Sequence, residues 1–96
     1  MIWLIGNRGM LGSDMEALLK RRSLEHAATD SEVDITDYDL LRKYASGLSP
    51  RWIVNCSAYT SVDGAEDNRE QAFAVNAAGV LNIARIAAGH GARLIH

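Results

Sequence analysis

The sequence predicts a doubly wound α/β fold, in which helices cover both faces of a parallel sheet. Short apolar runs alternate along the chain with segments of helical periodicity, and this alternation is typical of parallel strands joined by right-handed crossovers. The first apolar run, residues 1–5, leads directly into glycines at positions 6, 9 and 12. A strand that enters a glycine-rich turn and then a helix is the most informative pattern in the chain.

The periodicity places seven elements along the chain. Strands are expected at residues 1–6, 26–29, 52–56 and 93–96. Helices are expected at residues 10–22, 38–48 and 68–88. Asp37 is a typical N-cap for the second helix, and Gly89-His90-Gly91 is a typical end for the third. In the order 3-2-1-4 of the Rossmann arrangement, the strand at 93–96 would form one edge of the sheet.

Apolar side chains at helical spacing predict which faces turn inward. In the first two helices these are Met10, Leu11, Met15, Leu18, Leu19, Leu40, Leu41, Tyr44 and Leu48. Trp3 and Trp52 lie on strands and are expected in the core. Cys56 is expected to be a small buried apolar residue.

The chain has 96 residues, enough for one small domain, whereas a complete doubly wound domain has about six strands. The sequence ends within a predicted strand, so we expect it to be the first part of a longer protein; a miniature domain is the alternative. An unpaired edge at 93–96 would favour association into a homodimer or an aggregate.

Composition narrows the function classes. A formal net charge of −2 gives no reason to expect nucleic acid or an anionic membrane as a partner. No apolar run approaches the roughly 20 residues of a membrane span, and the first strand leaves no room for a signal peptide. The single cysteine excludes an intramolecular disulfide, so a reducing, cytoplasmic location is expected. His26, His90 and His96 are too widely spaced for a metal-ligand pattern.

The three glycines have distinct expected roles in binding a dinucleotide. Gly6 forms the tight turn, Gly9 allows the backbone to approach a pyrophosphate, and Gly12 allows the helix to pack closely on the strand. Asp30 follows the glycine motif at about the expected spacing. Dinucleotide-binding folds place a carboxylate for the adenosine ribose roughly 20 residues after the glycines. The sequence therefore predicts a dinucleotide-binding site; the alternative is a purely structural turn.

Residues 54–66 read V-N-C-S-A-Y-T-S-V-D-G-A-E, which resembles the V-N-x-x-A-x-T-x-V-D-x-A-E segment of dTDP-4-dehydrorhamnose reductases. The glycine string, the D-I-T-D segment at 34–37, A-V-N-A at 74–77 and residues 91–96 resemble the same family of extended short-chain dehydrogenases. The resemblance implies reduction of dTDP-4-dehydro-L-rhamnose to dTDP-L-rhamnose with NADPH or NADH, in the synthesis of rhamnose for cell-surface polysaccharides. The chain would then be the N-terminal part of an NAD(P)-binding domain.

The resemblance also assigns cofactor contacts. It places the pyrophosphate on Gly9, Met10 and Leu11, and the adenosine ribose on Asp30. Arg8 matches an arginine of GDP-fucose synthases that approaches the 2′-phosphate of NADP, whereas a carboxylate such as Asp30 favours a free 2′-hydroxyl. Arg8 as a solvated loop charge is the further alternative, and the choice between NADPH and NADH stays open.

Two more segments are assigned by the resemblance. Asp34 and Ile35 would flank the adenine, and Ala58, Tyr59 and Thr60 would line the path toward the nicotinamide.

Catalytic residues are missing from this stretch. The family donates its proton from the tyrosine of a Tyr-x-x-x-Lys helix, but the positions four residues after Tyr38, Tyr44 and Tyr59 hold Arg42, Leu48 and Asp63. These 96 residues alone are therefore expected to bind cofactor without turnover. A non-catalytic regulatory homologue, such as the regulatory subunit of methionine adenosyltransferase, and another nucleotide-sugar reductase or epimerase are the alternatives.

Asn76 resembles an asparagine common in extended dehydrogenases. A polar group on the helix surface is an equal alternative for this residue.

Overall fold

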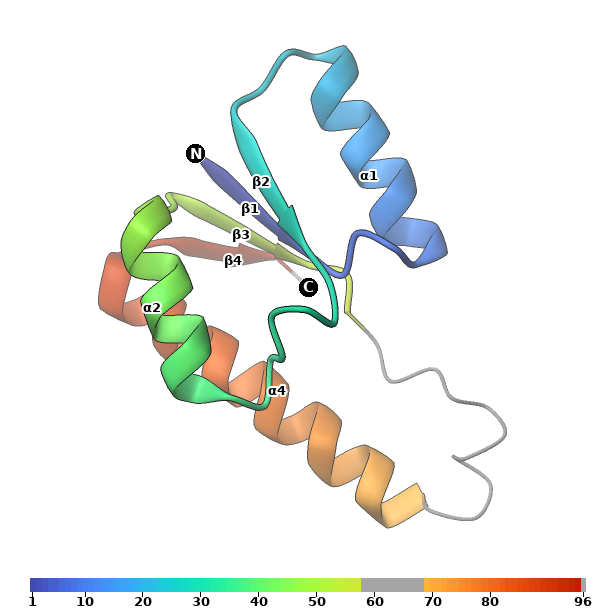
Figure 1. Cartoon of the computed structure of the whole chain (residues 1–96), viewed down its shortest axis with the longest axis vertical. Helices are drawn as coiled ribbons and strands as arrows, with labels where there is room; N and C mark the ends of the chain where they lie inside the picture. Colours follow the sequence, from blue (N-terminus) through green and yellow to red (C-terminus); the bar gives the residue numbers. More distant parts are fainter. Residues whose placement is uncertain (58–68, 96) are drawn as a thin grey trace.

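The computed structural model describes the backbone at residues 1–57 and 69–95, and the side chains at 1–57 and 76–95 (Figure 1). In chain order the elements are β1 (Ile2–Ile5), α1 (Met10–Arg21), β2 (His26–Thr29), α2 (Tyr38–Leu48), β3 (Trp52–Asn55), α4 (Arg69–His90) and β4 (Arg93–Ile95). The predicted alternation of strands and helices is confirmed, with ends that differ by one or two residues. The predicted first residue of the last helix, Asn68, and the last strand residue, His96, lie outside the described residues.

The strands form one parallel sheet, as predicted, but in the order β2-β1-β3-β4 rather than 3-2-1-4. The reason lies between β2 and α2, where two consecutive turns occupy the chain: Val33 N–H donates to Asp30 O and Asp37 N–H donates to Asp34 O, both at 3.0 Å. No strand forms there to extend the sheet beyond β2. Helix α2 instead carries the chain past β1. Strand β3 then pairs with the edge of β1 opposite β2.

Local signals set the helix ends. Asp37 caps α2 as predicted, since its Oδ1 accepts a hydrogen bond from Leu40 N–H at 3.1 Å. Ser49 ends α2 with a left-handed φ of 48°. Gly91 follows α4 with a φ of 64°, a conformation that glycine adopts without strain. None of the helices in the described part of the chain is long and apolar enough to cross a membrane.

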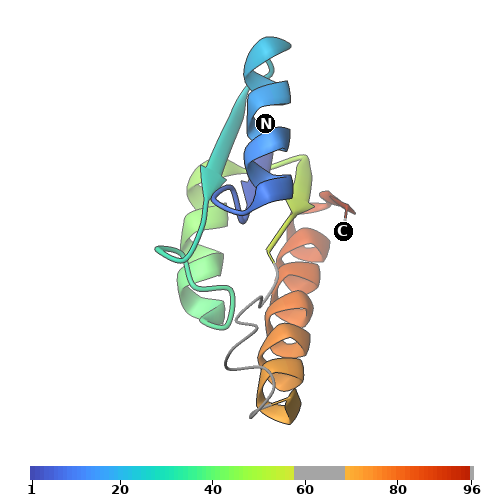
Figure 2. The ribbon, with the colours of Figure 1, turned by 90° about the vertical axis from the view of Figure 1, so that its right-hand side faces the viewer.

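The helices cover the two faces of the sheet unequally. Helix α1 packs on one face, against β1, while α2 and α4 run side by side on the other (Figures 1 and 2). The main core lies beneath α2 and α4 and consists of Trp3, Ile5, Val33, Leu41, Ala45, Ile53, Ile83, Ile86 and Ala87. On the α1 face, Leu4 and Leu19 are buried. The core therefore fixes β1 from both sides.

Some predicted core residues are exposed. Trp52 lies on the α1 face of β3, beyond the reach of α1, and is 39% exposed beneath the Arg93 guanidinium. Leu40 also faces solvent, because Leu41 and Ala45 form the buried stripe of α2. Met10 and Leu11 are 87% and 65% exposed, since they form the first turn of α1 beyond the end of the sheet.

Beta strand β4 forms one edge of the sheet, with β3 as its neighbour. Association through this edge stays a prediction.

Candidate functional site

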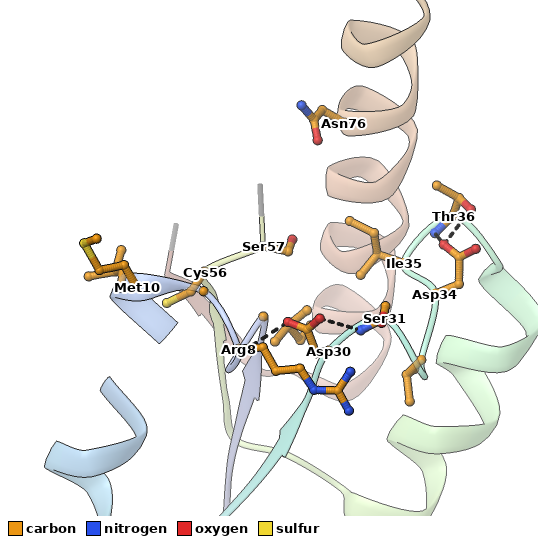
Figure 3. Close-up of a pocket in the computed structure, with 15 residues that line it drawn as sticks. Arg8, Met10, Asp30, Ser31, Asp34, Ile35, Thr36, Cys56, Ser57 and Asn76 are labelled. Atoms are coloured by element: carbon orange, nitrogen blue, oxygen red, sulfur yellow. Dashed lines mark hydrogen bonds between the residues drawn. The ribbon is translucent and has the colours of Figure 1, made fainter. Parts of the chain in front are cut away.

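A cleft of about 1060 Å³ opens at the carboxyl ends of β1, β2 and β3 (Figure 3). Its lining comes from the loop after β1, the loop after β2, the loop after β3 and α4. Strands β2 and β3 flank β1 on opposite sides. The connections of the chain therefore diverge at the end of β1, and the cleft lies at this point. In open parallel α/β sheets, ligands bind at this kind of switch point.

Two glycines allow the loop after β1 to fold back on its surroundings. Gly6 has a φ of 87°, and a Cβ there would lie 2.6 Å from the backbone nitrogen of Ser57. A Cβ at Gly12 would overlap the carbonyl oxygen of Gly6. Both positions therefore require glycine for the loop to form, Gly6 at the turn after β1 and Gly12 where α1 approaches that turn.

Gly9 differs from these two glycines. A Cβ there would meet only the Gly6 carbonyl oxygen, at an ordinary contact distance of 3.8 Å, and the backbone is extended, with φ −72° and ψ 170°. The folded chain thus does not itself require glycine at position 9. Gly9 borders the cleft, so the missing side chain leaves space for something outside the chain.

Helix α1 begins at this cleft without a side-chain cap at Gly9. The first N–H groups of a helix have no partner within it, and together with the helix dipole they favour an anion. Met10 and Leu11 line the cleft beside these N–H groups. The arrangement combines an anion-binding backbone with an apolar rim.

Charged side chains gather where β1 and β2 end. Asp30 Oδ1 accepts a hydrogen bond from Arg8 N–H at 3.3 Å, and Oδ2 accepts one from Ser31 N–H at 2.8 Å (Figure 3). The Arg8 guanidinium forms an ion pair with Glu32 at 3.4 Å. Hydrogen bonds from the backbone N–H groups of Asp30 and Glu32, with a contribution from the Arg8 charge, lower the pKa of the Glu32 carboxyl.

The loop after β2 is held by its own side chains. Asp34 Oδ1 accepts hydrogen bonds from the Thr36 hydroxyl at 2.7 Å and from Thr36 N–H at 2.9 Å (Figure 3). These two hydrogen bonds, the hydroxyl first, lower the pKa of Asp34. The Asp34 carboxylate therefore serves the loop itself.

Helix α4 braces the same loop from outside. The Asn82 side-chain amide donates to Ile35 O at 3.0 Å. The Ile35 side chain occupies the space above Gly79, where a Cβ would overlap it. Ile35 is thus fixed through both its backbone and its side chain while it lines the cleft.

The third wall follows β3. Asn55 is buried, and its Oδ1 accepts hydrogen bonds from the Ser57 N–H at 3.0 Å and from the Ser57 hydroxyl. Cys56 is half-buried and lines the cleft, and burial raises the pKa of its thiol.

The part of the chain with described side chains holds no group of three acidic, histidine or cysteine residues that suits a metal ion.

The structure brings most of the predicted site residues together. Those that line the cleft are Gly6, Arg8, Gly9, Met10, Leu11, Asp30, Asp34 and Ile35. Gly12 lies behind the lining and supports Gly6. Ala58, Tyr59 and Thr60 lie outside the described residues. Asn76, for which two interpretations were open, lines the cleft from α4.

Sequence reasoning missed that Asn55 and Asn82 brace the cleft and that Gly79 makes room for Ile35. The spacing of Asn76, Gly79 and Asn82 at intervals of three was the available signal, because residues three apart share a helix face. Asn55 gave a weaker signal, as a buried polar residue that ends an apolar strand.

The family model and the known relatives match nearly the whole chain and point to the same family. A family model described as the RmlD substrate binding domain matches residues 1–96. The dTDP-4-dehydrorhamnose reductase of Mycobacterium tuberculosis is 43% identical over 94 residues, covering 97% of this chain and 30% of the relative. The enzyme of the same name from Aggregatibacter actinomycetemcomitans is 37% identical, covering 97% and 32%. The chain therefore spans about 30% of the length of these relatives.

Solved structures show the same arrangement. The dTDP-4-dehydrorhamnose reductase of Bacillus anthracis, in complex with NADP, superposes with a TM-score of 0.86 at 31% identity, covering 97% of this chain and 34% of that one. The UDP-glucose 4-epimerase of Thermus thermophilus, in complex with NAD, has a TM-score of 0.85 at 24% identity, covering 98% and 36%. The second likeness shows the fold alone.

The Asp34–Thr36 contact predicts a pH dependence. A lowered pKa means that the carboxylate supports the loop above its reference value of 3.8, and that this support is lost as the pH falls through the lower folded value. Thr36→Val removes the hydroxyl, so the Asp34 pKa should rise toward 3.8. Carboxyl titration by NMR measures this change, with Ser46→Ala, an exposed helix substitution, as the control. An unchanged Asp34 titration in Thr36→Val would contradict the assignment.

The packing of Ile35 on Gly79 predicts a contrast between two glycines of α4. Gly79→Ala should destabilise the protein by about 1–3 kcal/mol, because the new methyl overlaps Ile35. Gly89→Ala adds the same methyl in open space and should stabilise the helix by up to about 1 kcal/mol. Denaturant unfolding of both variants measures the difference. Equal stabilisation by both would show that Ile35 does not occupy the space above Gly79.

Proposed function

Because the chain belongs to the RmlD family, the family of the dTDP-4-dehydrorhamnose reductases, we propose that it is the N-terminal part of the cofactor-binding domain of such a reductase. In this proposal the whole protein uses NADPH or NADH to reduce dTDP-4-dehydro-L-rhamnose to dTDP-L-rhamnose in the cytoplasm. The observation that carries the proposal is the cleft at the switch point of the sheet, bordered by Gly9 and the uncapped start of α1.

The residues of the cleft fit a dinucleotide. Gly9 leaves space at the start of α1, and the N–H groups of the first turn suit a pyrophosphate. Met10 and Leu11 add apolar contact beside it. Asp30 follows β2 directly and places a carboxylate in the cleft, which suits a ribose hydroxyl. Ile35 offers an apolar surface for an adenine on a loop that Asn82 holds in place.

When bound, the cofactor supplies a hydride for the carbonyl carbon of the sugar. The residues of this chain would bind the dinucleotide and orient it, with the adenosine half at the ends of β1 and β2. Reduction of a ketone also requires a proton for the developing alkoxide. Since Tyr38, Tyr44 and Tyr59 have no lysine four residues later, we propose that the proton donor belongs to another part of the protein.

Supporting evidence for the cofactor class comes from a relative. The B. anthracis reductase that superposes on this chain holds NADP. In the present chain, Arg8 favours a 2′-phosphate and Asp30 favours a free 2′-hydroxyl, so we propose that both NADPH and NADH bind.

The enzymatic proposal is tested with the full-length protein, dTDP-4-dehydro-L-rhamnose and either reduced cofactor. We expect oxidation of the cofactor together with formation of dTDP-L-rhamnose. Cofactor binding without turnover of this sugar would contradict the proposed activity. Other dTDP-4-keto sugars then separate a reductase of different specificity from a non-catalytic binding protein.

The proposed role of Gly9 predicts a loss of binding without a loss of folding. Gly9→Val should weaken NADPH and NADH binding at least about tenfold, because a branched side chain blocks backbone hydrogen bonds to the phosphates. Since the nearest atom to a Cβ is 3.8 Å away, the variant should keep its circular dichroism spectrum. Gly47→Val, at an open position on α2, is the control. Unchanged affinity in Gly9→Val would rule out this pyrophosphate site.

A further inference from the structure

Glu32 connects the charged groups at the end of β2 into one network. Its Oε1 accepts a hydrogen bond from Asp30 N–H at 3.0 Å, and its Oε2 lies 3.4 Å from Nη2 of Arg8. Asp30 in turn accepts a hydrogen bond from Arg8 N–H at 3.3 Å. Glu32 is not part of the cleft lining, whereas Arg8 and Asp30 are. Glu32 therefore reaches the cleft through Arg8.

The network contains two carboxylates and one guanidinium at the corner that suits the adenosine ribose. A ribose hydroxyl can donate a hydrogen bond to Asp30, and it needs no cation. A 2′-phosphate carries nearly two negative charges, so it is repelled by Asp30 and Glu32 and requires the guanidinium. While Arg8 is paired with Glu32, its charge is already compensated.

The ion pair is also easy to rearrange. The Arg8 and Glu32 side chains are 66% and 49% exposed, and ion pairs of this kind are weak in water. Arginine can bind a phosphate with two parallel hydrogen bonds. This interaction is stronger than a single exposed contact with a carboxylate. A phosphate at this corner would therefore compete with Glu32 for the same guanidinium.

We propose that Glu32 is a positioning residue that sets the relative affinity for NADPH and NADH, by holding the Arg8 guanidinium on a carboxylate instead of a 2′-phosphate. This inference rests on the proposed dinucleotide binding. It assigns the preference to competition between Glu32 and the 2′-phosphate for one arginine. Asp30 then favours the free 2′-hydroxyl, which only NADH offers.

The test is Glu32→Gln in the full-length protein, with direct binding titrations of NADPH and NADH. Glutamine keeps one oxygen that can accept the Asp30 N–H, and it replaces the charged carboxylate with a neutral amide of the same size. We expect NADPH affinity to rise about three- to fivefold relative to NADH affinity, which is what release from an exposed ion pair implies. NADH affinity should stay within about twofold. Adenosine 2′,5′-bisphosphate and adenosine 5′-monophosphate should show the same change in ratio, which isolates the 2′-phosphate from the nicotinamide.

Two further variants make the test specific. Glu25→Gln removes the same charge from an exposed residue before β2, at the opposite end of that strand from the cleft, and should leave the ratio unchanged. In an Arg8→Ala background, Glu32→Gln should change the ratio far less than it does alone. If the full change persists without Arg8, Glu32 acts by repulsion alone and the inference is overturned.

The remaining outcomes are distinct. A ratio in Glu32→Gln that matches the unsubstituted protein would overturn the role of Glu32 while the proposed function stands. Binding of neither dinucleotide to the unsubstituted protein would overturn the proposed function and this inference with it. Circular dichroism of each variant shows whether the fold is retained, and Glu32→Ala tests whether the Asp30 N–H contact contributes separately.

Discussion

The cleft depends on the close approach of the Gly6 backbone to two neighbours. Gly6 contacts the backbone of Ser57 on one side, and its carbonyl oxygen lies where a side chain at position 12 would begin. These contacts hold the loop after β1, the loop after β3 and the start of α1 together at the carboxyl ends of the strands. A methyl group at position 6 or 12 would force these segments apart. Gly6 and Gly12 allow these segments to pack closely, and the cleft lies beside Gly9.

The walls of the cleft and its charged groups are held in different ways. Backbone contacts and buried groups fix the walls: Asn55 orders the turn after β3, and Asn82 holds Ile35 from α4. The charged corner consists of exposed side chains that pair with one another, with Glu32 on Arg8 at its outer side. Backbone contacts and buried groups thus set the shape, while in our proposal the choice between NADPH and NADH rests on exposed side chains whose ion pair costs little to break.

The sequence predicted the features that follow from local chemistry. The glycine spacing, the Asp37 cap and the carboxylate at the end of β2 each depend on a few neighbouring residues, and the structure places them as expected. The strand order was less accessible, because it depends on whether residues 31–37 form a strand or turns, and the Asp34–Thr36 hydrogen bonds favour turns. The exposure of Trp52 follows from how far α1 extends over the sheet, which no local pattern encodes.

Trp3 lies within hydrogen-bonding reach of this arrangement, since its indole N–H donates to the Thr29 hydroxyl at 3.0 Å. The carbonyl oxygen of the same Thr29 accepts hydrogen bonds from Gly6 N–H at 2.7 Å and Asn7 N–H at 3.3 Å. A single residue therefore links a buried indole to the first amides of the glycine loop. Displacement of that loop would reach the indole through Thr29 and alter the surroundings of a natural fluorophore. The fluorescence of Trp3, on β1, should therefore respond to movement of the loop that borders the cleft.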